Sequence, residues 1–428
     1  MFGIILGLGV LMTLAYRGWS IIWIAPISAG VVALTGGLDL LEAYKEPYME
    51  GFVSFAKQWF PVFMLGAIFG KLMEDTGMAK SVAISLSKMM GKERAILGVL
   101  LSAAVLTYGG VSLFVVVFAV YPLAINLFRE ANISRKLIPG TVALGAFTFT
   151  MTAAPGTPQI QNLIPMQYFH TSPTAAPIMG IVASLVMGGG GYFYLRWRER
   201  VLRQQGEVFT EPENKGQTDD VDEKVPNFIL SLLPLITVLV TLNILKWDII
   251  VSLISGILLI LLLNIQKYKS FVQGINNGAV GSVTAIINTS AAVGFGSVVK
   301  AVPGFETLTN MLLNIKGNPL ISEAIAVNLL AGATGSASGG MGIALEALGE
   351  KYFELATQTG ISPEAFHRIA SIASGGLDTL PHNGAVLTLL TITGMSHKDS
   401  YRDIFVVSLL IPLIALAVAI ILAALGIY

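Results

Sequence analysis

Four segments rich in glycine, proline and small polar residues interrupt otherwise apolar stretches of this 428-residue chain, two in each half. The first half has TYGGVS at residues 107–112 and TAAPGTPQIQNLIP at 152–165. The second half has ATGSASGGMG at 333–342 and GGLDTLPHNG at 375–384. Interrupted apolar segments at matching places in two halves are typical of secondary transporters and point to their binding site.

Composition places the chain in a membrane. It is 54% hydrophobic and 12% charged, with a mean hydropathy of +0.73, whereas soluble domains carry about 25% charged residues. The formal charge is zero, so no overall field favours nucleic acid, and the absence of cysteine excludes disulfides and thiolate metal sites. No cofactor or metal motif is found. Residues 1–15 are apolar without a basic region before them, and we expect the first membrane helix there rather than a cleaved signal.

A spanning helix needs roughly 20 apolar residues, and the chain offers ten candidates plus two kinked apolar pairs. We interpret the pairs as re-entrant hairpins, which makes the protein all-α. The spans are expected at about 1–16, 20–35, 59–73, 137–169 (broken), 175–196, 227–245, 249–264, 280–299, 363–393 (broken) and 404–426, and the hairpins at 95–128 and 319–352.

The two halves follow the same order of elements, which predicts two inverted repeats of an odd number of spans each. The first repeat covers 1–197, with scaffold helices in 1–75. The second covers 226–428, with scaffold helices in 227–300. Between them, residues 198–225 carry mixed charge without apolar periodicity and predict a cytoplasmic linker.

Basic residues predict the orientation. Threading the chain through these spans places most of its 26 lysines and arginines on one side, which is then cytoplasmic. Both termini would face outside, in the inner membrane of a bacterium. The hairpins would open from opposite sides.

Broken helices that meet at one depth would turn their ends toward a common cavity, and helix N-termini favour an anion. Hydroxyls, amides and glycines in the breaks would complete a substrate site without any Lys or Arg inside a break. The alternative is that these small residues serve contacts between helices. The candidates are Thr107, Gly109, Gly110, Ser112, Thr157, Gln159, Asn162, Ser336, Ser338, Gly339, Thr379 and Asn383; Gln161 is a further one in the first break, and Asn288 is a weaker one.

Asp378 and His382 stand four residues apart at the break of the second broken helix. Ionisable groups inside a membrane are expensive and commonly mark ion or proton paths, and His changes charge near neutral pH. We expect one or both to carry a coupling proton, or His382 to help hold the substrate. The alternative is a helix cap for Asp378 and a bond to a freed carbonyl for His382. His367 is expected in a loop.

At these residues the chain resembles the gluconate permease (gluconate:proton symporter) family of the ion transporter superfamily. The likeness extends over nearly the whole chain and rests on Ala-Pro-Gly-Thr-Pro at 154–158, Gly-Ser-Ala-Ser at 335–338, Ser-Gly-Gly-Leu-Asp at 374–378 and Ser-Tyr-Arg-Asp at 400–403. It implies import of a small hydroxy acid with protons, and a homodimer in which a hairpin-bearing transport domain moves as an elevator against a scaffold.

The chain departs from the family at both breaks. The first break holds no histidine, and in the second the acidic residue precedes the histidine. Gluconate and smaller acids such as 3-hydroxybutyrate, lactate or citrate therefore stay open. Sodium coupling of a citrate-type acid is the main alternative, and Asn, Ser and Thr oxygens could coordinate the ion. An anion channel is a remoter one. A membrane enzyme is the third alternative, and the absence of any catalytic motif from the sequence argues against it.

Overall fold

The computed structural model describes residues 2–212, 225–313, 318–381 and 383–428, and these form helices and turns without a β-strand. The helices of the first half are α1 (Phe2–Tyr16), α2 (Ile21–Gly36), α3 (Leu40–Ala43), α4 (Met49–Asp75), α5 (Met78–Met90), α6 (Ala95–Tyr108), α7 (Leu113–Glu130), α8 (Ile138–Ala146), α9 (Phe149–Thr152), α10 (Ile160–Phe169) and α11 (Pro177–Gln204).

The second half also consists of long, short and broken helices. They are α12 (Phe228–Asn243), α13 (Ile249–Leu263), α14 (Tyr268–Ala301), α15 (Gly304–Leu313), α16 (Pro319–Thr334), α17 (Ala337–Thr359), α18 (Pro363–Ser374), α19 (Gly384–Thr393), α20 (His397–Phe405) and α21 (Ile411–Ala424). Short 3-10 turns are η2 (Lys92–Arg94), η3 (Arg135–Leu137), η6 (Ile265–Lys267) and η7 (Leu377–Thr379), and η1 (Tyr44–Tyr48) and η8 (Val406–Leu410) are π-helical.

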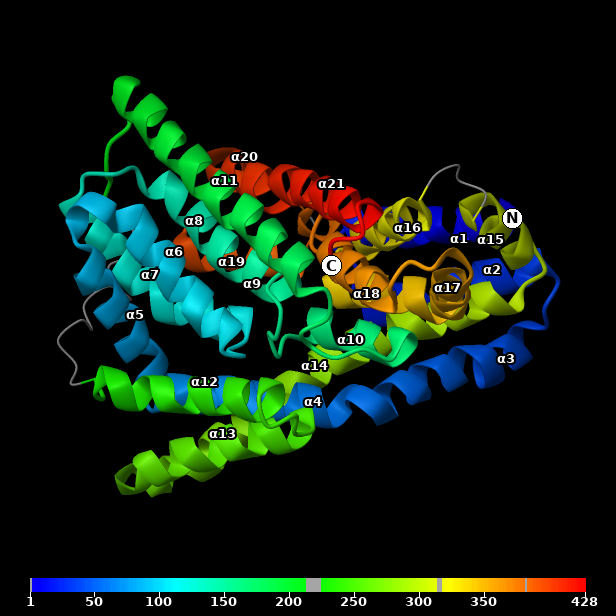
Figure 1. The fold of residues 1–428 in the computed structure, drawn as a ribbon, viewed down its shortest axis with the longest axis horizontal. Coiled ribbons are helices and arrows are strands. Elements are labelled where there is room, and N and C mark those ends of the chain that lie inside the picture. Colours follow the sequence, from blue (N-terminus) through cyan, green and yellow to red (C-terminus); the bar gives the residue numbers. More distant parts are fainter. Residues whose placement is uncertain (1, 213–224, 314–317, 382) are drawn as a thin grey trace.

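Two long helices cross the molecule and pack along each other (Figure 1). One runs over Leu40–Asp75 through α3, η1 and α4, and the other over Ile265–Ala301. The sequence predicted only 59–73 and 280–299 here. Hydropathy detects the apolar window alone, and polar residues on an exposed helix face do not end a helix, so both predictions were too short.

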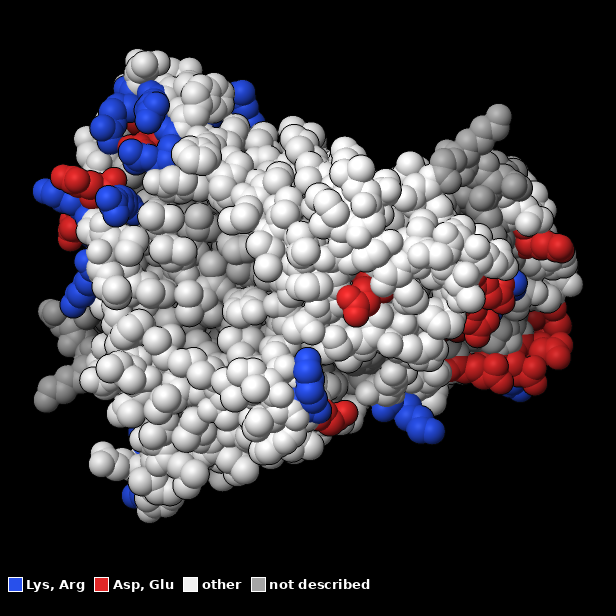
Figure 2. Space-filling view, in the orientation of Figure 1, with Lys and Arg blue, Asp and Glu red and all other residues white. Residues whose placement is uncertain are grey.

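Five helices of the described part are long and apolar enough to cross a membrane, and six shorter apolar ones accompany them. Helices α1 and α2 have 15 and 16 residues, below the roughly 20 of a regular span. They pack as an antiparallel pair, as do α12 and α13. Figure 2 shows most charged residues gathered toward the two ends of the molecule and a largely white face between them, broken near the middle by a red residue and by a blue and red pair, a distribution that suits a bilayer.

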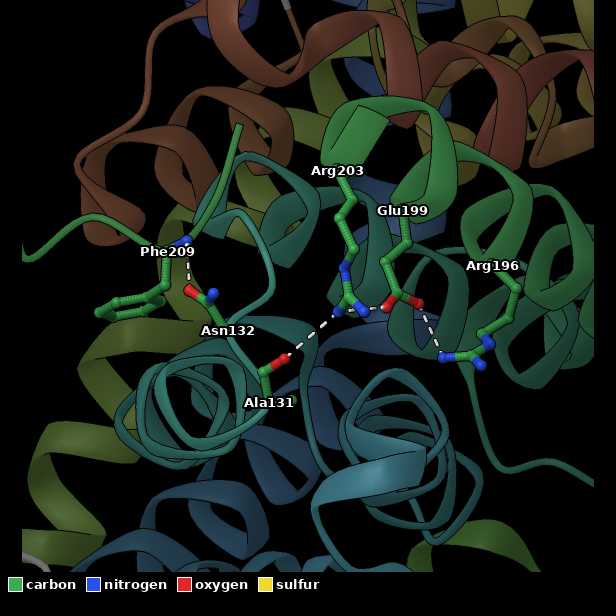
Figure 3. A network of polar contacts seen from close by, with 6 residues as sticks. All are labelled: Ala131, Asn132, Arg196, Glu199, Arg203 and Phe209. Atoms are coloured by element: carbon green, nitrogen blue, oxygen red, sulfur yellow. Dashed lines mark hydrogen bonds and ion pairs between the residues drawn. The ribbon is translucent and has the colours of Figure 1, made fainter. Parts of the chain in front are cut away.

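Helix α11 continues to Gln204, so residues 198–204 are helical rather than part of the predicted linker. Its last turns are hydrogen-bonded to the C-terminal end of α7 (Figure 3). Glu199 accepts bonds from Arg196 at 2.7 Å and Arg203 at 3.2 Å, and Arg203 also donates to the carbonyl of Ala131. The chain that follows is held by ion pairs Lys136–Glu207 and Arg129–Glu211, both 2.8 Å. Most of the remaining linker, 213–224, lies outside the described residues.

Candidate functional site

The first break lies between α9 and α10 and is held by the amide of Asn162. Its Nδ2 donates to the carbonyl oxygens of Thr157 and Pro173, both at 2.9 Å. Gly156 has a φ of +80°, a conformation that glycine adopts without strain. The fully buried Asn162 thus satisfies carbonyls that the interrupted helix leaves free.

The second break, between α18 and α19, repeats this arrangement. Asn383 Nδ2 donates to the carbonyl oxygens of Asp378 and Gly335, both at 2.9 Å, and Asn383 Oδ1 accepts the amide N–H of Val386 at 2.9 Å. Asn383 is therefore the N-cap of α19 as well as the brace of the break. His382, the other predicted proton carrier, lies outside the described residues.

Each break is tied to a hairpin tip by one side-chain amide. Gln159 Nε2 donates to the carbonyl oxygens of Thr107 at 2.7 Å and Val111 at 3.3 Å, at the tip between α6 and α7. The bond from Asn383 to Gly335 does the same at the tip between α16 and α17. There Ser336 caps α17 by accepting the N–H of Gly339 at 3.1 Å. The four interrupted segments therefore form two braced pairs.

A cavity of about 430 Å³ lies where these pairs approach each other. Seven of the predicted residues line it: Ser336, Ser338, Gly339, Asp378 and Asn383, together with the further candidates Gln161 and Asn288. Helices α17 and α19 both begin at its wall, where the first N–H groups of a helix lack intrahelical partners and the dipole is positive. Among the described residues that line it, none is Lys or Arg.

Apart from Gln161, the first half contributes other residues to this cavity than the sequence predicted. Its wall there includes Leu113, Phe114, Phe147, Met151 and Gln161. The remaining predicted residues do not line the cavity: Thr107, Thr157 and Asn162 are buried, and Gln159 bonds the hairpin backbone. This set, which does not line the cavity, is Thr107, Gly109, Gly110, Ser112, Thr157, Gln159, Asn162 and Thr379. In this conformation the cavity is therefore lined by most of the predicted residues of the second half and by few of those of the first half.

The turn between α1 and α2 also lines the cavity, which the sequence analysis missed. Ala15, Gly18, Trp19 and Ser20 stand in its wall. The available signal was the shortness of the two helices, each too short for a regular span. A turn that ends against the cavity explains why two such short apolar helices follow each other.

Three oxygens around the cavity lack a hydrogen-bond partner within the described residues. They are Oδ1 of Asp378, Oε1 of Gln161 and Oδ1 of Asn288, and each is buried. Buried polar atoms without partners are costly and commonly indicate a bound water, ion or ligand. The cavity therefore combines helix N-termini, hydroxyls and one carboxyl group with free acceptor oxygens.

His367 and Arg368 are not in a loop, contrary to the expectation for His367. Ser362 caps α18 and places both residues inside this helix, which is buried from Ala365 to Ser374. The Arg368 guanidinium donates to the carbonyls of Ala153, Pro173 and Ala175 and to Asn162 Oδ1, so a cation does reach the first break. His367 Nδ1 lies 2.6 Å from the hydroxyl of Thr171. Hydropathy alone could not reveal this, because the carbonyls that hold Arg368 come from the other half of the chain.

Apolar helices that pass through a largely uncharged belt, with interrupted helices around a central cavity, define a multi-pass membrane transporter and not an enzyme. The chain belongs to the GntP permease family, whose family model matches residues 1–254. It is 43% identical to the uncharacterized transporter YxjC of Bacillus subtilis over 95% of both chains, and 28% identical to an uncharacterized permease of Haemophilus influenzae over 55% of this chain and 48% of that one. The prediction of a gluconate permease relative is confirmed.

The fold is similar to that of the YdaH transporter of Alcanivorax borkumensis. The TM-score is 0.61 with 15% identity, over 91% of this chain and 90% of that one. At this identity the likeness concerns the fold alone.

Proposed function

We propose that this permease imports a small organic anion together with protons. The observation that carries the proposal is the cavity itself, in which Asp378 is the sole Asp, Glu, Lys or Arg among the described lining residues. Helix N-termini and the Ser336, Ser338 and Asn383 side chains suit a carboxylate and its hydroxyl group. A site without a fixed cation releases its anion readily, as a carrier must.

In this proposal Asp378 carries the coupling proton, with His382 as its partner. The carboxyl group is buried and its Oδ1 has no hydrogen-bond partner among the described residues. A protonated Asp378 removes the repulsion between the carboxylate and the incoming anion, so that proton and substrate favour each other's binding. The substrate class is a gluconate-like sugar acid or a hydroxy monocarboxylate such as 3-hydroxybutyrate.

The proposed mechanism is an elevator built from two inverted repeats. Order and packing support matching α1, α2 and α4 with α12, α13 and α14, and the hairpin α6–α7 with α16–α17. The hairpins and broken helices would move as the transport domain against the remaining scaffold. Residues such as Thr107, Thr157, Gln159 and Asn162 would form the half-site that the opposite conformation opens. A homodimer in the bacterial inner membrane, with both termini outside, completes the proposal.

Uptake by purified protein in liposomes tests it. Labelled gluconate, 3-hydroxybutyrate, lactate and citrate are offered with an inward pH gradient or an inward sodium gradient. We expect one acid to accumulate with the pH gradient alone, and Asp378→Asn to abolish accumulation. Asp39→Asn is the matched control, because Asp39 caps the short helix α3 at an exposed position away from the cavity. Failure of every acid under both gradients contradicts the proposal.

A sodium-coupled carrier of a citrate-type acid is the second candidate. The free oxygens of Gln161 and Asn288 favour it, since hard cations prefer oxygen ligands. Accumulation that requires sodium at fixed pH selects this candidate. Gln161→Leu and Asn288→Leu would then raise the sodium concentration needed for half-maximal uptake.

A further inference from the structure

Helix α16, the first arm of the second hairpin, carries a carboxyl group that the cavity does not use. Glu323 is fully buried, and neither of its carboxyl oxygens has a hydrogen-bond partner within the described residues. It does not line the cavity. Its neighbour in sequence, Ser322, bonds the hydroxyl of Tyr352 on α17 at 3.0 Å, so the two arms of the hairpin are joined at this level.

Within the described residues, the elements that pack most extensively against α16 supply no counter-charge to Glu323. These elements are α1, α15, α17, α18, η7 and α21, and α1 and α21 contain no Asp, Glu, Lys, Arg or His. On α18 the ionisable groups bond elsewhere: Glu364 accepts the N–H of Ala176, His367 contacts Thr171, and Arg368 holds the first break. The others on these elements are Glu306, Glu346, Glu350, Lys351, Tyr352, Glu354 and Asp378, and none of them bonds Glu323.

An ionised carboxylate cannot persist in such a place, because burial removes its hydration and nothing replaces it. A proton on the carboxyl group removes the charge. Glu323 therefore holds a proton for as long as α16 is packed as it is here, and it can lose that proton only when the hairpin admits water.

Helix α16 is also coupled to the second break. Asn328, further along the same helix, accepts the backbone N–H of Leu377 through Oδ1 at 2.9 Å. Leu377 precedes Asp378 in the 3-10 turn of the break. A displacement of α16 that hydrates Glu323 would therefore move the backbone beside Asp378, and a change at the break would reach Glu323.

We propose that Glu323 is a second proton-binding site, on the second hairpin, that takes up a proton from water on one side of the membrane and releases it on the other. The carboxylate oxygen gains H⁺ to become a carboxylic acid and later returns it to water, and no electron moves. The inference rests on the proposed proton-coupled transport for its role in the cycle, but the protonation of Glu323 itself does not.

Infrared spectroscopy of the whole protein in liposomes tests the protonation without any substrate. At neutral pH the wild type is expected to show carbonyl-stretch absorption of a protonated carboxyl group. Glu323→Gln should lose part of that band, and Asp378→Asn reports the contribution of the other buried acid. Glu350→Gln is the matched control, because Glu350 lies on α17 with its side chain 84% exposed. A band unchanged in Glu323→Gln overturns the proposal, whether or not any acid is transported.

Transport separates a role in the cycle from a merely buried acid. With an acid that the uptake panel identifies, Glu323→Gln should reduce accumulation driven by the pH gradient at least tenfold and retain counterflow, which needs no net proton release. Glu323→Asp, which keeps the acid, should restore part of the accumulation. Wild-type accumulation by a folded Glu323→Gln protein contradicts the role in coupling.

Discussion

Asn162 and Asn383 make the same bond at the two breaks. The Nδ2 group of each donates at 2.9 Å to the carbonyl oxygen five residues earlier, that of Thr157 in one break and Asp378 in the other. The second bond of each Nδ2 reaches a different segment, Pro173 or Gly335. One amide thus holds each interruption in shape, and at the second break it also positions the residue to which we assign the proton.

Replacing Asn383 by alanine should destabilise the protein by about 1–3 kcal/mol, since it removes an N-cap and leaves buried carbonyls unsatisfied. Thermal unfolding in detergent measures the loss. Asn383→Ser keeps a neutral capping oxygen without the amide that bridges both carbonyls, so it should fall between the wild type and Asn383→Ala. Equal unfolding temperatures for all three proteins would show that the brace is dispensable.

The arms of the second hairpin meet too closely for any side chain at Gly340. A Cβ atom there would overlap the backbone of Leu330 and Ala331. Gly340→Ala should therefore force the arms apart, at a cost of about 1–3 kcal/mol or more, and reduce uptake. Gly281→Ala is the control, because Gly281 lies within α14 with open space around it. If both variants unfold at the wild-type temperature, the arms of the hairpin are not in close contact at Gly340.

Asp403 joins α20 to α11 inside the protein. Its Oδ1 accepts the hydroxyl of Tyr194 at 2.7 Å and Nε of Arg198 at 3.1 Å, and Asp403 is almost fully buried. Asp403→Ala leaves Arg198 without its counter-charge and should cost about 2–4 kcal/mol, given the partial exposure of the arginine. The double variant Asp403→Ala/Arg198→Met should recover part of the loss in a thermal unfolding series. If the double variant is no more stable than Asp403→Ala, the lost ion pair does not explain the destabilisation.

Labelling of a thiol introduced at Trp19 tests whether the α1–α2 turn lines the cavity. The chain contains no cysteine, so a single introduced thiol can be labelled cleanly. We expect a transported acid to slow labelling of Trp19→Cys by a polar maleimide. Trp23→Cys is the matched control, since Trp23 is exposed and does not line the cavity. Equal labelling of both variants with and without the acid would remove the turn from the site.

The sequence predicted the class, the family and the positions of the interruptions, because glycine, proline and small polar residues clustered inside apolar stretches indicate broken membrane helices. It could not predict which segments of the two halves contact each other. The sequence did not reveal that Arg368 donates hydrogen bonds to the first break, since its carbonyl partners lie about 200 residues earlier in the chain. The contribution of Trp19 was missed because a turn between two apolar helices looks the same at a membrane surface as it does against a cavity.

The most direct test of the central claim is proton movement during uptake. Liposomes containing the purified protein and a trapped pH indicator receive the acid that the panel identifies, without sodium and without an imposed gradient. The account predicts acidification of the interior that follows the acid in, is saturable, and is lost in Asp378→Asn. Saturable uptake with no change of internal pH, or uptake that begins only when sodium is added, would contradict it.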